Sequence, residues 1–113
     1  MAKDMSLTFL YDLYGELLSP RQREIFEGYY GDDLSLSELA EAYSITRQGV
    51  LQNIRSAEHK LQETDKKLKF SQTVLRNRRR AEQIETLADL LAKQGNAAGI
   101  QIAYLARQMK EDT

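Results

Sequence analysis

The chain has 113 residues, of which 42% are hydrophobic and 29% are charged, and its formal net charge is −1 at pH 7. This size and composition fit one globular domain, or one such domain with a helical extension. The absence of cysteine excludes disulfides and thiolate metal sites. A single histidine, His59, cannot supply the several ligands of most zinc sites, and most His-based catalytic sites need further groups that the chain lacks. No apolar run approaches the roughly 20 residues of a membrane span, and no signal-peptide pattern is present. We therefore expect a cytoplasmic protein that is not an enzyme and needs no metal or cofactor.

Charge is distributed unevenly along the chain. Residues 1–45 hold three basic and nine acidic residues, residues 46–80 hold ten basic and three acidic, and residues 81–113 hold three basic and five acidic. A basic middle segment between acidic flanks is typical of a surface that binds a polyanion. The alternative is that the basic residues form the solvated face of a long helix.

Helical periodicity begins near the N-terminus. The first predicted helix spans Leu7 to Leu18, with an apolar stripe made of Leu7, Leu10, Tyr14, Leu17 and Leu18. A second start follows, because Ser19 and Gln22 can form a capping box and Pro20 stands in the first turn, where its missing N–H does no harm. This second helix is expected to bury Ile25, Phe26 and Tyr29, with Tyr30 as a further candidate.

The strongest start signal lies between residues 34 and 39. Ser35 and Glu38 have capping-box spacing, and Leu34 and Leu39 stand at the positions of a hydrophobic staple. The pattern predicts a short helix from Leu36 to about Tyr43.

A tight connection of Ser44 and Ile45 leads from this short helix to Thr46, the predicted cap of a fourth helix. A short capped helix, a tight turn and a second capped helix predict a helix-turn-helix, the geometry in which DNA-binding proteins place the second helix in the major groove.

The remainder of the chain is also predicted to be helical. The stripes are Val50, Ile54, Ala57, Leu61, Leu68 and Leu75, then Ala81, Ile84, Ala88 and Leu91, and finally Ile100, Ala103 and Tyr104, with a break or bend near Leu68–Ser71. No strand alternation occurs. We expect an all-α fold with a helix-turn-helix domain over residues 1–62. Residues 63–113 are expected to form a helical extension that pairs two copies into a homodimer, because a lone helix could not bury these stripes.

The predicted fourth helix carries the candidate binding residues. With Val50 and Ile54 facing inward, eight residues are placed outward or at the cap: Thr46, Arg47, Gln48, Gly49, Gln52, Asn53, Arg55 and Ser56. Arginine suits guanine, glutamine and asparagine suit adenine, and serine and threonine suit phosphate. Glycine leaves room for a close approach of the backbone. Helical hairpins with this spacing also serve as plain protein-docking units, so both functions remain open at this point.

Several motifs resemble known bacterial proteins. Leu18–Glu24 followed by Asp33–Glu41 is similar to the promoter-reading fourth region of sigma factors. The chain is more similar to the YlxM family, small helix-turn-helix proteins tied to the signal recognition particle, over roughly residues 7–69. The residues that carry this second resemblance are Tyr11–Leu18, Arg21–Glu24, Tyr29–Tyr30, Asp32–Asp33, Ser35, Glu38–Glu41, Thr46–Val50 and Asn53–Arg55. Leu51 and Gln52 replace the aromatic and acidic residues that usually follow the valine in that family.

The residue pattern and this resemblance together lead to two hypotheses. The first is a DNA-binding regulator that works as a homodimer and binds duplex DNA. The second is an adaptor that contacts the RNA or protein of the signal recognition particle without reading DNA. The arginines at positions 76, 78, 79 and 80 could contact such an RNA, or could be an exposed helical face.

Overall fold

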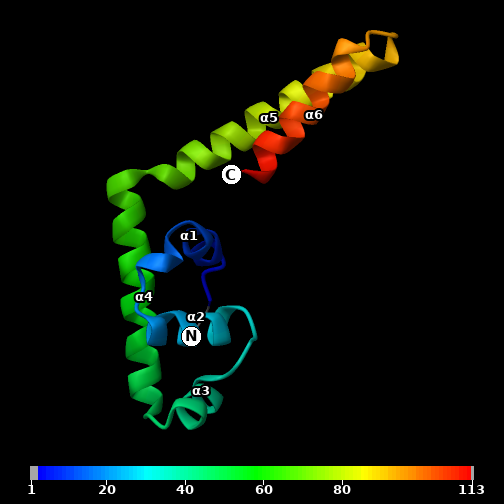
Figure 1. Cartoon of the computed structure of the whole chain (residues 1–113). Coiled ribbons are helices and arrows are strands. Elements are labelled where there is room, and N and C mark those ends of the chain that lie inside the picture. Colours follow the sequence, from blue (N-terminus) through cyan, green and yellow to red (C-terminus); the bar gives the residue numbers. More distant parts are fainter. Residues whose placement is uncertain (1–2, 113) are drawn as a thin grey trace. The chain divides into compact units, whose positions relative to one another are not determined.

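The computed structural model describes residues 3–112, which form helices and turns and contain no strand. The elements in chain order are α1 (Ser6–Tyr14), the short 3₁₀ helix η1 (Gly15–Leu17), α2 (Pro20–Tyr30), α3 (Leu36–Tyr43), α4 (Arg47–Leu68), α5 (Phe70–Lys93) and α6 (Ala98–Glu111) (Figure 1). The predicted all-α fold is confirmed.

Two compact units make up the chain, residues 1–69 and residues 70–113. The division lies seven residues beyond the expected one at 62/63, because α4 continues without interruption to Leu68. Lys69 then adopts the left-handed conformation (φ 54°) and ends the helix. This ending occurs inside the stretch Leu68–Ser71 where the sequence suggested a break.

In the first unit, α1, α2 and α3 all pack against one side of α4 (Figure 1). The helix α4 contributes four side chains with no exposed surface: Val50, Ile54, Ala57 and Leu61. Ile25 and Phe26 of α2 and Leu39 of α3 are equally well buried. The four buried residues of α4 have the helical spacing that the sequence predicted. Burial of their apolar stripe therefore determines which side of α4 faces inward.

The capping predictions are confirmed. The Gln22 amide donates to Ser19 Oγ at 3.2 Å and the Ser19 amide donates to Gln22 Oε1 at 3.2 Å. The corresponding pair at α3 joins Ser35 and Glu38 at 3.0 and 3.1 Å. Each box satisfies two backbone donors that the first turn of a helix leaves free.

The first helix differs from its prediction. A continuous helix to Leu18 would have placed Leu17 on the buried stripe, but the chain tightens into η1 and Leu17 is 54% exposed. Leu18, which the sequence placed on the same stripe, is buried as predicted, at 4% exposure. The change of period from 3.6 to 3.0 residues per turn rotates the side chains that follow, and this explains why Leu17 leaves the buried stripe.

The second unit is a hairpin of α5 and α6 (Figure 1). Small side chains are buried between its helices: Ala81, Ala88, Ala103 and Ala106. The backbones come so close that a Cβ on Gly99 would lie 2.4 Å from the Ala88 carbonyl oxygen. At one edge, Glu85 pairs with Lys110 (2.8 Å) and with Arg107 (3.3 Å). The hydrogen bond from Lys110 is the main cause that lowers the pKa of Glu85.

Candidate nucleic-acid interface

The helix-turn-helix consists of α3, a three-residue turn and α4. The turn begins at Ser44, which adopts the left-handed conformation (φ 54°, ψ 42°). The Ile45 amide donates to the Ala40 carbonyl at 3.0 Å, and the Ile45 side chain packs against the core. Thr46 then caps α4 by accepting a hydrogen bond from the Gly49 amide at 2.9 Å. The backbone hydrogen bond of Ile45 and the packing of its side chain thus fix the angle between α3 and α4.

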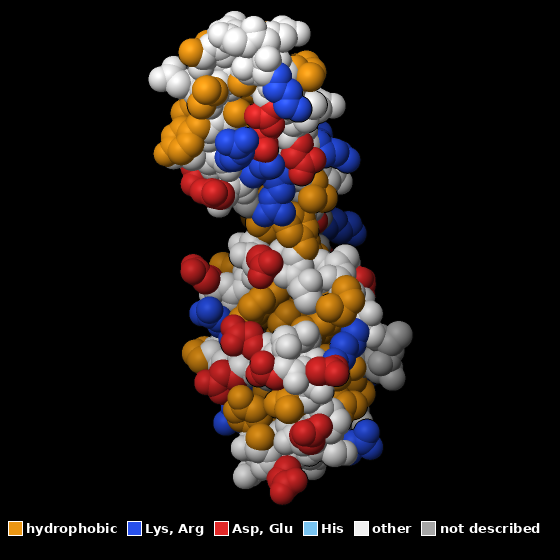
Figure 2. All heavy atoms as spheres, turned by 90° about the vertical axis from the view of Figure 1, so that its right-hand side faces the viewer, with side chains coloured by type: hydrophobic (Ala, Val, Ile, Leu, Met, Phe, Trp, Pro, Cys, Tyr) orange, Lys and Arg blue, Asp and Glu red, His pale blue; other side chains and the backbone are white. Residues whose placement is uncertain are grey.

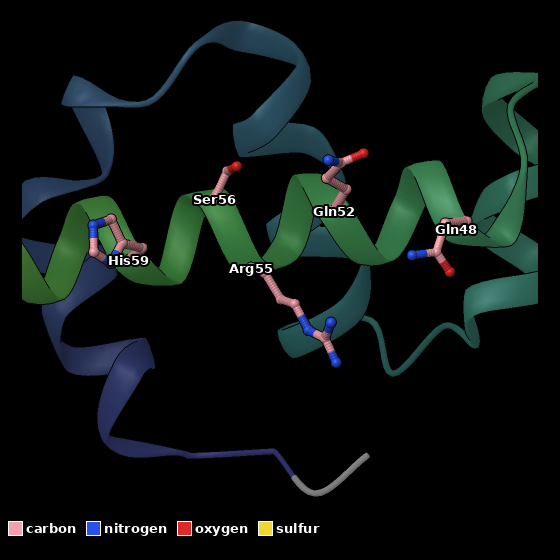
Figure 3. A pocket seen from close by; sticks show the side chains of 5 residues that line it. All are labelled: Gln48, Gln52, Arg55, Ser56 and His59. Atoms are coloured by element: carbon pink, nitrogen blue, oxygen red, sulfur yellow. The ribbon is translucent and has the colours of Figure 1, made fainter.

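The outer face of α4 is polar. Five side chains on it line an open depression of about 400 Å³: Gln48, Gln52, Arg55, Ser56 and His59. Figure 3 shows them on the side of α4 turned away from the rest of the first unit. Gln52 follows Gln48 by four residues, and Arg55 and Ser56 follow Gln52 by three and four, so these side chains share the outer side of α4 with His59. Because Val50 and Ile54 face the core, this stripe is left open to a ligand.

The eight predicted residues have different environments. Thr46, Arg47, Gln48, Gln52, Arg55 and Ser56 are exposed, whereas Gly49 and Asn53 are half-buried. The Asn53 side-chain amide donates to the Gly49 carbonyl at 2.9 Å, so part of its hydrogen-bonding capacity is used within the helix. Its contact with a base would be restricted accordingly. The hydroxyl of Thr46 likewise serves the cap.

One residue on this face was missed from the sequence. His59 is not among the eight residues predicted from the sequence, but it lines the same depression as Gln52 and Arg55. Its position seven residues after Gln52 is two helical turns away, so the helical repeat contained the signal.

Two hydrogen bonds turn acidic side chains of α4 away from this outer stripe. The Tyr30 hydroxyl donates to the Glu58 carboxylate, and the Tyr14 hydroxyl donates to Asp65 Oδ1 at 2.8 Å. Burial, followed by the hydrogen bond to Glu58, raises the pKa of Tyr30, so this hydroxyl stays protonated and remains a donor. Two of the three acids among residues 46–80 are therefore tied to α1 and α2.

The basic side chains of the same helix are exposed. They are Arg47, Arg55, Lys60, Lys66 and Lys67. The surface of α1–α3 is instead rich in exposed acids, as Figure 2 shows for the side of this unit opposite α4. A polyanion would be repelled by that side and attracted by α4.

Within residues 3–112 no group of three or more His, Cys, Asp or Glu side chains is arranged to hold a metal ion. None of the helices in this range combines the length and apolarity that crossing a bilayer requires.

Replacing Thr46 with alanine is expected to lower the free energy of unfolding of the first unit by about 1 kcal/mol, because the Gly49 amide loses its acceptor. Chemical denaturation followed by near-UV circular dichroism would measure this. Thr46→Ser keeps the hydroxyl and should retain most of the stability. Equal losses in both variants would assign the effect to the threonine methyl group instead of the cap.

Comparison with known proteins identifies the family. Residues 1–99 match the family UPF0122, described as "Putative helix-turn-helix protein, YlxM / p13 like". This match extends about 30 residues beyond the similarity visible in the motifs, and includes all of α5.

Individual relatives agree with this match. The chain is 38% identical over 111 residues to the UPF0122 protein of Geobacillus kaustophilus, covering 98% of this chain and 97% of the relative. It is 40% identical over 91 residues to that of Shouchella clausii, covering 80% and 74%. A relative from Thermoanaerobacter pseudethanolicus is 50% identical over 62 residues, covering 55% and 53%. The chain therefore belongs to the family of YlxM- and p13-like helix-turn-helix proteins.

Proposed function

We propose that this protein is a non-enzymatic regulator that binds duplex DNA through the N-terminal half of α4. The observation that carries the proposal is the exposed stripe of Gln48, Gln52 and Arg55 on the helix that follows the helix-turn-helix turn. A major groove is about 12 Å wide and admits one α-helix. Glutamine can pair with adenine and arginine with guanine through two hydrogen bonds each, and these pairs distinguish bases.

The charge distribution supports the same orientation. Arg47 and Lys60 flank the stripe and are exposed, so they can contact phosphates on either side of the groove. The hydrogen bonds that hold Glu58 and Asp65 on the inner side reduce repulsion at the point of contact. The acidic surface of α1–α3 restricts binding to one side of the unit.

An anisotropy titration of a labelled mixed-sequence duplex tests the proposal. At 50 mM salt we expect saturable binding that unlabelled duplex displaces. If three phosphates are neutralised, raising the salt to 200 mM should weaken binding by roughly 40-fold. No change in anisotropy at any protein concentration up to about 200 µM, which lies above the usual dissociation constants of non-specific binding (about 1–100 µM), would exclude the function.

A second candidate is an adaptor that contacts the RNA of the signal recognition particle. The observation in its favour is a separate set of exposed arginines on α5, Arg76, Arg79 and Arg80, whose spacing places them close together on one helix. Alanine at these three positions should weaken binding to that RNA and leave duplex binding through α4 nearly unchanged. The opposite result, loss of duplex binding alone, would count against the adaptor.

A further inference from the structure

The hairpin of α5 and α6 leaves its large apolar side chains outside. Alanines occupy the space between the helices, as described above, whereas six larger residues are 38–63% exposed: Ile84, Leu87, Leu91, Ile102, Leu105 and Met109. Hydrophobic side chains are correspondingly visible on the surface of the hairpin in Figure 2. Two helices alone have no further layer to cover these groups, although burial of such groups is the main source of helical stability in proteins.

These six residues lie on one face of the hairpin. In α5 they are at positions 84, 87 and 91, and in α6 at positions 102, 105 and 109, so both sets have spacings of three and then four residues. At 100° per residue, and with Ala81, Ala88, Ala103 and Ala106 facing the partner helix, both sets point to the same side of an antiparallel pair. The ion pair between Arg107 and Asp89 (3.5 Å) lies toward the opposite side.

We propose that a second copy of this chain covers this apolar face, forming a four-helix bundle from two hairpins. The spacing of three and four residues is that of bundle seams, in which each helix contacts two neighbours. In α5 the first neighbour is α6, packed along Ala81 and Ala88, and the second is a helix of the other copy.

Area and charge both favour a second copy. The six side chains expose on the order of 500 Å², which is more than half of the roughly 800 Å² that each partner contributes to a stable interface. The six positions contain no charged residue, so the face can meet its own copy across a two-fold axis without like-charge repulsion. None of the six positions has a basic side chain that could pair with the phosphates of a nucleic acid.

The oligomeric state in solution tests the proposal without any nucleic acid, so it is independent of the proposed DNA binding. Light scattering coupled to gel filtration should give twice the 13.0 kDa of one chain for the unmodified protein. Replacing Leu87 and Leu105 together with lysine should raise the dimer dissociation constant by about 100-fold or more, because two charges would be buried on each side. Both residues are more than half exposed in the single chain, so its own folding should be little affected.

A matched control keeps the test decisive. Leu90 and Ile100 are 50% and 66% exposed, are on the same two helices, and lie outside the apolar face. Lysine at both positions should leave the dimer intact. A mass of 13.0 kDa for the unmodified protein at about 100 µM, well above the dissociation constant of a specific interface, would overturn the proposal. Dissociation of the control with an intact Leu87/Leu105 variant would overturn it equally.

Discussion

Alanine at both Gln52 and Arg55 is expected to weaken binding to a preferred DNA duplex by about 30-fold or more. Each residue can make a bidentate contact with a base, worth about 1–3 kcal/mol. Both side chains are exposed on the outer stripe of α4 (Figure 3). Their removal should therefore cost affinity without costing stability. Anisotropy titrations at constant salt, with a duplex chosen by selection from a random pool, would measure the change.

The control for this variant is alanine at Lys93 and Gln94, which removes the same charge and the same side-chain amide. Both residues are exposed at the end of α5, in the other unit. We expect this control to bind DNA as the unmodified protein does. Equal affinity of the Gln52/Arg55 variant and the unmodified protein would show that the outer face of α4 is not the interface.

Replacing Phe26 with alanine is expected to lower the free energy of unfolding of the first unit by about 3–5 kcal/mol. Phe26 is 1% exposed and stacks between Tyr11 and Tyr30, with ring centroids 4.7 and 4.5 Å away. Its loss would leave a cavity beside the tyrosine that holds Glu58. Urea denaturation followed by near-UV circular dichroism suits this measurement, because five of the six tyrosines lie in residues 1–69.

Two further variants distinguish packing from other causes. Phe26→Leu preserves most of the volume and should cost much less than the alanine variant. Leu17→Ala removes a side chain that is 54% exposed and should change stability by no more than about 0.5 kcal/mol. Similar losses for Phe26→Ala and Leu17→Ala would contradict the assignment of the core to α2 and α4.

The local features of this fold could be predicted from the sequence. The caps at Ser19, Ser35 and Thr46 each join residues three positions apart, so the sequence contains the whole interaction. The inner side of α4 followed in the same way from the spacing of Val50 and Ile54. With that side known, exposure of Gln52 and Arg55 could be expected, although their role in binding remains a prediction.

Contacts between distant residues could be assigned only from the tertiary structure. Tyr14 and Asp65 are 51 positions apart, and Tyr30 and Glu58 are 28 apart, so no local pattern relates them. The small residues along α5 and α6 likewise did not indicate that alanines would form the inner seam and leave the leucines outside.

The physical reason for this division is the range of each interaction. Capping and helical periodicity depend on neighbouring residues within one or two turns, and the identities of these neighbours can be read directly from the sequence. The partner of a buried hydroxyl, or of an apolar face, depends on which helices pack together. Which helices pack together depends on the apolar surface buried over the whole unit. This arrangement is seen only in the tertiary structure, in which α1–α3 pack against α4 and α6 packs against α5.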